Sequence, residues 1–125
     1  MQGGLHGGSD LGRRAGTWDT TVKDMPGARL PTVVIRSSDG GDTWSAPQTL
    51  HEEWTGAVRS MIETQSGAIV FTSMKMQHMP GRHSVLTYFS DDDGRSWHAG
   101  NVIDLGGNGH HDGVTEGTLV ELSDG

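Results

Sequence analysis

The feature that most constrains the fold of this chain is an eight-residue pattern that occurs twice, Ser-x-Asp-x-Gly-x-(Thr/Ser)-Trp. The two copies, box 1 and box 2, cover residues 37–44 and 90–97. Each position suits a tight turn between strands, because Ser and Asp side chains accept hydrogen bonds from nearby backbone N–H groups and Gly adopts a positive φ without a clash. The closing Trp offers a large apolar surface for packing between sheets. Turn formation therefore explains Asp39 and Asp92 without any catalytic role.

Short runs rich in β-branched and aromatic residues flank both boxes. No stretch of eleven or more residues shows the apolar period of a helix. The 20 glycines and 4 tryptophans fit short strands joined by tight turns. The predicted fold class is therefore all-β, with a hairpin around residues 65–67. The expected strands cover residues 30–36, 45–50, 57–64, 68–76, 83–90, 98–105 and 114–122.

The repetition extends beyond the boxes. Residues 60–67 align with residues 118–125, since both read small-apolar-apolar-Glu and end in Gly. The repeating unit is strand, turn, strand, loop, strand, box, strand. Four strands in about fifty residues make one blade of a β-propeller. We interpret residues 30–125 as a partial propeller domain, preceded by a Gly-rich, irregular segment at residues 1–29.

Charge and composition exclude several classes of partner. The formal net charge of -7 argues against binding to a nucleic-acid backbone. The absence of cysteine excludes disulfides and thiolate metal sites. No apolar run is long enough for a membrane span, and no signal peptide is visible at the N-terminus. Residues 90–94 lack the ligand spacing of a calcium loop, so no metal or other cofactor is expected.

The boxes resemble the Asp-box, or bacterial neuraminidase repeat, which also occurs in propellers that are not sialidases. The last stretch, GHHDGVTEGTLVELSDG, resembles an exo-sialidase segment in which a Glu precedes a strand of the form Thr-Val-Val-Glu-Leu-x-Asp-Gly. In that family the Glu activates a tyrosine nucleophile, and the matching residue here is Glu116. Family members often carry Pro, Ser or Cys where this chain has Gly117. The resemblance implies about two to two and a half blades of a six-bladed sialidase-type propeller, and a secreted or periplasmic protein.

The resemblance also implies a reaction, the release of terminal sialic acid from glycoconjugates. The substrate carboxylate would repel an Asp or Glu nucleophile, whereas a tyrosine hydroxyl activated by a Glu meets less repulsion. The family binds that carboxylate with three arginines and uses a separate Asp as acid/base. The only tyrosine here, Tyr88, is interpreted as packing within a strand. Asp10, Arg13 and Arg14 precede box 1, as the family's acid/base and first arginine do, but no motif identifies them.

Other polar residues are candidates for contact with the sugar. By the repeat, Glu116 precedes an inner strand, so the loop that leads to it would lie at the mouth of the central channel. The candidate substrate-binding residues are His110, His111, Asp112 and Arg59, with His78 and His83 as further members of the same face. The two adjacent histidines could instead be turn residues. They would diverge in an extended loop, so a metal site is not expected there.

Three functions remain open from the sequence. The first is a sialidase-type hydrolase whose partner is a sialylated glycan, and the second is a non-catalytic propeller that binds glycans or a protein. The third is a propeller hydrolase for another sugar, which paired carboxylates across the channel would indicate. A propeller closes with at least four blades. We therefore expect this chain to be a piece of a longer protein, inactive and marginally stable by itself.

Overall fold

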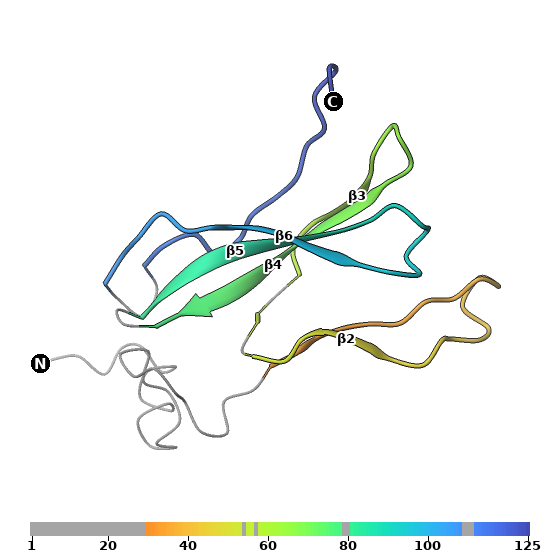
Figure 1. Cartoon of the computed structure of the whole chain (residues 1–125), viewed down its shortest axis with the longest axis horizontal. Coiled ribbons are helices and arrows are strands. Elements are labelled where there is room, and N and C mark those ends of the chain that lie inside the picture. Colours follow the sequence, from red (N-terminus) through yellow and green to blue (C-terminus); the bar gives the residue numbers. More distant parts are fainter. Residues whose placement is uncertain (1–29, 54, 57, 79–80, 109–111) are drawn as a thin grey trace, which may run out of the picture.

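The computed structural model describes residues 30–53, 55–56, 58–78, 81–108 and 112–125, and this part of the chain is all-β (Figure 1). Its strands are β1 (Thr32–Val34), β2 (Gln48–His51), β3 (Met61–Glu63), β4 (Ile69–Gln77), β5 (Arg82–Ser90) and β6 (His98–Ile103). β1 and β2 form an antiparallel pair, and the others form an antiparallel sheet in the order β3-β4-β5-β6. None of the described residues forms a helix long and apolar enough to cross a membrane. The irregular segment expected at residues 1–29 lies outside the described residues.

The observed strands agree with all but one of those expected. The hairpin predicted around residues 65–67 joins β3 to β4, and the Gly67 N–H donates to the Thr64 carbonyl oxygen at 2.8 Å. The strand expected at residues 114–122 is wrong. A strand requires a neighbouring strand whose main-chain groups pair with its own. Among the described residues of this segment, only Val114 makes such a bond to a strand, from its N–H to the His83 carbonyl oxygen at 3.3 Å.

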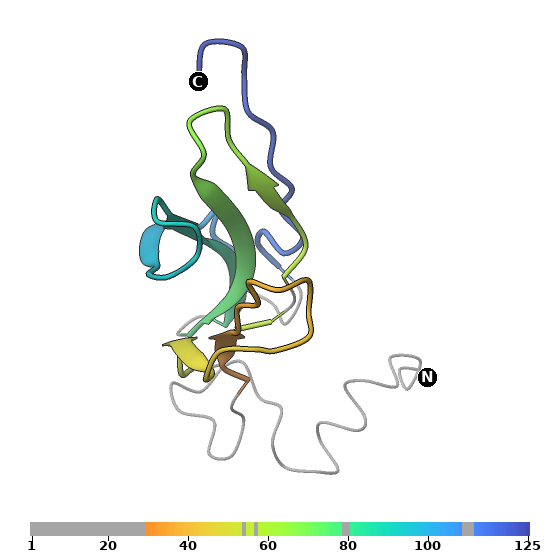
Figure 2. The same cartoon turned by 90° about the vertical axis from the view of Figure 1, so that its right-hand side faces the viewer.

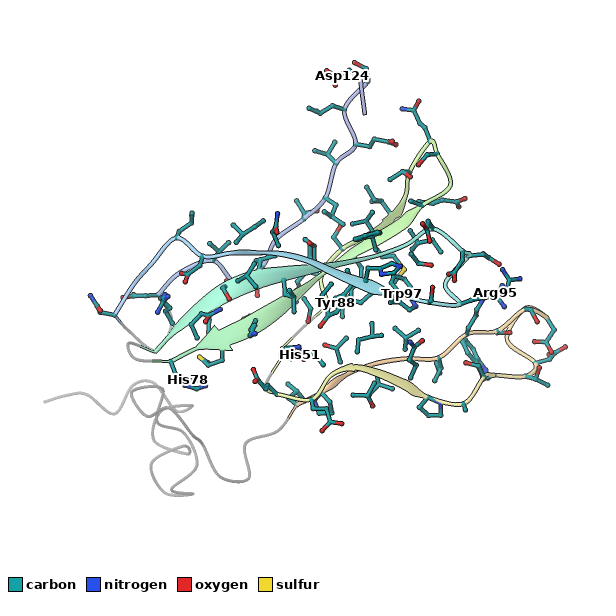
Figure 3. All side chains as sticks on the ribbon, in the orientation of Figure 1. His51, His78, Tyr88, Arg95, Trp97 and Asp124 are labelled. Carbon is teal, nitrogen blue, oxygen red and sulfur yellow. The ribbon has the colours of Figure 1, made fainter. Side chains whose placement is uncertain are left out.

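The core lies between the β1–β2 hairpin and one face of the four-stranded sheet. Phe71 on β4 stands opposite Tyr88 on β5, and their rings stack with centroids 5.0 Å apart. Both are buried together with Leu86. The partly buried residues packed against them are Val34, Leu50 and Trp97. In Figure 3, Tyr88 and Trp97 lie near the hairpin, so the aromatic side chains join the two sheets.

Buried hydroxyl groups add a polar contact between the same two sheets. The Thr32 hydroxyl of β1 lies 2.7 Å from the Thr55 hydroxyl and 3.3 Å from the Ser73 hydroxyl of β4. The Thr55 hydroxyl also approaches the Leu30 carbonyl oxygen at 2.9 Å. Because a buried hydroxyl without a partner is costly, these mutual bonds favour one position of the hairpin on the sheet.

Residues 112–117 cover part of the opposite face of the four-stranded sheet. The Thr72 hydroxyl of β4 donates to the Gly117 carbonyl oxygen at 2.9 Å. A Cβ at Gly117 would lie 3.3 Å from both methyl groups of Val85, so the segment rests directly on the sheet. Figure 2 shows the chain continuing from there alongside β3. The sheet thus has the preceding hairpin on one face and the following segment on the other, which fits one blade of a β-propeller.

Of the two to two and a half blades expected, the described residues form one complete four-stranded sheet, the outer hairpin of the sheet before it, and an extended segment after it. The order β3-β4-β5-β6 is a simple meander, as in a propeller blade that runs from the inner to the outer strand. Box 2 connects the last two strands of this sheet, and box 1 connects the two strands of the hairpin. Both boxes therefore occupy the position that the repeat predicts.

Candidate functional site

The two boxes form the same turn with the same hydrogen bonds. In box 2 the Ser90 hydroxyl donates to Asp92 Oδ1 at 2.8 Å and accepts the Gly94 N–H at 2.8 Å. The Asp92 carboxylate accepts the Ser96 N–H at 2.8 Å and the Ser96 hydroxyl at 2.5 Å. In box 1 the corresponding distances are 2.8, 2.8, 2.9 and 2.5 Å, among Ser37, Asp39, Gly41 and Thr43. The glycine of each box has a positive φ, as the turn requires.

These hydrogen bonds hold both box carboxylates in the ionised form. Bonds from Thr43, and then from Ser37, lower the pKa of Asp39 to about 2. The bonds from Ser96 hold the pKa of Asp92 well below its usual range. A carboxyl group that acts as a general acid near neutral pH needs a raised pKa instead. Both aspartates therefore suit turn formation and do not suit proton donation.

The antiparallel order separates the connections into two ends of the four-stranded sheet. The β3–β4 turn and box 2 lie at one end, and the β4–β5 turn lies at the other. Thr55, which precedes β3 and pairs with Lys75, and Asp104, which follows β6, belong to the end opposite the boxes. The boxes can therefore stabilise one end while the other end is free to carry a binding site.

An ion pair between two of the candidate residues lies beside β3, next to the middle of β4 and β5. Arg59 Nη2 lies 2.6 Å from Glu116 Oε1. Arg59 precedes β3, whereas Glu116 belongs to the segment that follows the complete sheet. Their side chains are 50% and 64% exposed, so both are open to a ligand from solvent. The structure thus brings together a candidate catalytic residue and a candidate substrate contact that are far apart in the sequence.

Side-chain contacts hold the segment that contains Glu116 beside the start of the complete sheet. The Leu119 N–H donates to the Ser60 hydroxyl at 3.2 Å, and the Glu121 carboxylate accepts the Gln65 N–H at 2.9 and 3.1 Å. Ser60 and Thr118 are equivalent in the repeat, and their hydroxyls lie 3.5 Å apart. Equivalent residues of successive units are therefore neighbours and follow the same direction, as inner strands of adjacent propeller blades do.

The loop after β6 is attached to β5 at both of its ends. The Arg82 guanidinium forms a two-bond ion pair with Asp104, in which Nε lies 2.8 Å from Oδ1. Arg82 and the Gly106 N–H together lower the pKa of Asp104 to about 2. At the far end, the His83 N–H donates to the Asp112 carbonyl oxygen at 2.9 Å. The sequence analysis does not predict this ion pair. An Arg at the first residue of one strand and an Asp just after the next strand could have indicated it.

Of the other candidate residues that the structure describes, Asp112 is exposed, His78 is partly buried and His83 is buried. His110 and His111 lie outside the described residues. The Asp112 carboxylate accepts the Asn108 N–H at 2.9 Å, so it closes its own loop. The His83 side chain is buried on β5, so it has little access to a ligand in the described part of the chain. No group of three or more His, Cys, Asp or Glu side chains that could hold a metal ion occurs within the described residues.

Tyr88 belongs to the core and not to the candidate site. It is buried against Phe71, and burial raises the pKa of its hydroxyl. Its side chain is on the face that packs against the β1–β2 hairpin, whereas Gly117 lies on the opposite face of the sheet. A hydroxyl in that position cannot reach Glu116 without unfolding of the sheet, so the structure supports the packing role inferred from the sequence.

Comparison with known families assigns most of the chain to a repeat family. A family model described as "BNR repeat-like domain" matches residues 11–125. The match includes both boxes, the complete sheet and the Arg59–Glu116 pair. No solved structure matches the chain. The assignment to this family therefore depends on the sequence match, and the geometry of the two boxes agrees with that assignment.

Proposed function

The chain belongs to the BNR repeat-like domain family, and from that premise we propose that it forms part of an exo-α-sialidase-type glycoside hydrolase. The reaction is the release of terminal sialic acid from glycoconjugates. BNR-like domains are found in sialidases and in other glycosidases, so the family is consistent with glycoside hydrolysis. Within that range, the sialidase proposal rests on Glu116.

The observation that carries the proposal is the position of Glu116. It is an exposed carboxylate next to Gly117, which rests on the face of the sheet, and it directly precedes the segment that lies beside β3. We propose that in the closed propeller the segment that enters this inner strand lines the central channel, where ligands bind. A carboxylate there can accept a proton from a substrate-facing hydroxyl group.

The charge of the substrate explains why a glutamate would act through a tyrosine. Sialic acid carries a carboxylate on its anomeric carbon, and a second carboxylate that approached the same carbon would be repelled. A tyrosine hydroxyl is neutral until its proton moves to a nearby base, so it attacks with less repulsion. We assign Glu116 the role of that base. The tyrosine, the acid/base Asp and the arginine triad are not identified in this chain.

The activity is proposed for the full-length protein with a closed, six-bladed propeller. The described residues contain one complete blade, and a propeller closes with at least four. The single tyrosine of this chain, Tyr88, is in the core, so the nucleophile must come from another blade. The 125 residues alone are expected to bind sugar weakly at best and to be inactive.

The test is the Glu116→Gln variant of the full-length protein, assayed on a sialoside with a chromogenic leaving group. Loss of a general base typically costs about 10²- to 10⁴-fold, so kcat should fall by that range while the fold stays intact. Glu63→Gln is the matched control, because Glu63 is an exposed glutamate on β3 and its substitution removes the same charge. Turnover equal to wild type in Glu116→Gln would remove this residue from the mechanism.

The same assay distinguishes the two alternatives. A wild-type protein that binds sialosides or another glycan without turnover would support the non-catalytic propeller, in which the boxes and sheets serve only as a scaffold. A protein that hydrolyses a different glycoside would support a propeller hydrolase with another specificity. Either result would reject the sialidase proposal while leaving the fold assignment unaffected.

A further inference from the structure

The Arg59–Glu116 pair has a geometry that the sialidase proposal does not use. We propose that Arg59 is a positioning residue, which orients the Glu116 carboxylate towards the hydroxyl that it deprotonates; this inference rests on the proposed function. The sequence predicts a substrate contact for Arg59. In the structure its Nη2 instead donates to Glu116 Oε1 at 2.6 Å. A hydrogen bond between two charged groups such as these is stronger than one between neutral groups.

The shape of the guanidinium group suits this role. Arginine has a planar set of donors in a fixed arrangement, so a bond from one nitrogen restricts both the position and the tilt of a carboxylate. Arg59 donates its hydrogen bond to Oε1 of Glu116, so that Oε2 is the oxygen that accepts the proton. A glutamate at an exposed position otherwise samples several rotamers. Holding the base in one of them contributes to catalysis by orientation.

The exposure of the pair argues against a role in stability. Both side chains are at least half exposed, and exposed ion pairs add little to folding. The backbone on either side of Glu116 is fixed by other contacts. The Thr72 hydroxyl bonds to the Gly117 carbonyl oxygen at 2.9 Å, and the Ser60 hydroxyl accepts the Leu119 N–H at 3.2 Å. Removal of the Arg59 side chain should therefore release the carboxylate without displacing the segment.

The experiment measures kcat and KM for Arg59→Gln and Arg59→Lys in the full-length protein with the sialoside substrate. We expect Arg59→Gln to lower kcat by about 10- to 100-fold, the effect of misplacing a catalytic group, with KM changed by less than about threefold. Arg59→Lys should recover part of kcat, because the ammonium keeps the charge and loses the fork. The matched control is Arg95→Gln, since Arg95 is exposed and bonds to a carbonyl oxygen in box 2.

A double-mutant cycle separates positioning from direct substrate contact. If Arg59 acts through Glu116, then Arg59→Gln should cause no further loss in the Glu116→Gln background. Additive losses, or a large rise in KM with kcat unchanged, would mean that Arg59 binds the substrate independently, and would overturn the inference.

The outcomes for the two proposals are distinguishable. Wild-type protein that cleaves no sialoside overturns the proposed function and this role with it. A Glu116→Gln variant that loses activity while Arg59→Gln retains wild-type kcat overturns the positioning role alone. Thermal unfolding of each variant provides the control for folding, and Arg59→Gln should melt at nearly the wild-type temperature because the pair is exposed.

Discussion

At the scale of single residues, the box aspartates show how a carboxylate can be fully used by the fold. Asp92 accepts bonds from one hydroxyl on each side of it and from one backbone N–H, all within four residues along the chain. A residue engaged in this way is fixed, ionised and unavailable for proton donation. Glu116 differs, because its carboxylate accepts a bond from a side chain of another unit of the repeat. The two kinds of acidic residue therefore have different physical roles.

The hydrogen-bonded carboxylates predict the response of the protein to acid. The pKa values of Asp39 and Asp104 are lowered to about 2, and that of Asp92 is also lowered, from an ordinary value of 3.8. A folded-state pKa below the unfolded one gives stability that is complete above the unfolded pKa and is lost as pH falls through the folded pKa. The urea midpoint of the full-length protein should therefore be flat above about pH 5 and should fall between about pH 4 and pH 2.

Asparagine variants test which carboxylates cause this acid dependence. Asp92→Asn and Asp104→Asn should lower the urea midpoint at pH 7 and flatten its decline in acid, because the ionised acceptor is gone at every pH. Asp91→Asn is the control, since it removes the same charge from an exposed neighbour within box 2. An acid decline as steep as wild type in both variants would show that other groups control it.

At the scale of elements, the strand positions were predictable because the boxes mark the turns between them. Each box marks where one strand ends and the next begins. The positions of β1, β2, β5 and β6 could therefore be predicted from the boxes. The segment at residues 114–122 has the same composition, yet composition cannot tell whether a partner strand is present. The Arg59–Glu116 contact also could not be predicted. The repeat aligns Arg59 with Gly117. Only the packing of successive units shows that the Arg59 side chain bonds to Glu116.

The closing tryptophans of the two boxes should differ in their contribution to stability. Trp97 is half-buried, lies edge-on to Phe71 at 5.1 Å, and donates its indole N–H to the Gly94 carbonyl oxygen. Trp44 is 58% exposed in the described part of the chain. We expect Trp97→Ala to cost about 2 kcal/mol, below the range for a fully buried Trp. Trp44→Ala should stay within about 0.5 kcal/mol.

Urea denaturation of the 125-residue chain, followed by circular dichroism, measures both changes. The comparison holds the residue type and the box constant, so that only the packing differs. Equal losses of stability for the two variants would contradict this prediction, because they would show that the Trp44 side chain is packed in solution.

At the scale of the whole molecule, the complete sheet has neighbours on both faces, but within the described residues the hairpin before it and the segment after it each have one side uncovered. Large apolar side chains are exposed on these elements. The most exposed in the C-terminal segment are Val120, at 79%, and Leu122, at 62%. In a propeller such residues face the next blade, which would pair with the free edge of this segment. The position of the exposed apolar surface therefore agrees with the proposal of further blades.

The exposed C-terminal segment predicts self-association of the 125-residue chain studied by itself. An extended segment with apolar side chains and unpaired main-chain groups offers an edge to a second copy. The double variant Val120→Lys/Leu122→Lys adds two positive charges at that edge and should shift the chain towards monomer in sedimentation velocity. Leu105→Lys is the matched control, because Leu105 is 78% exposed but belongs to the loop after β6. A wild-type chain that sediments as a monomer and melts in one sharp, reversible transition would contradict this prediction, since the uncovered faces would then carry no cost.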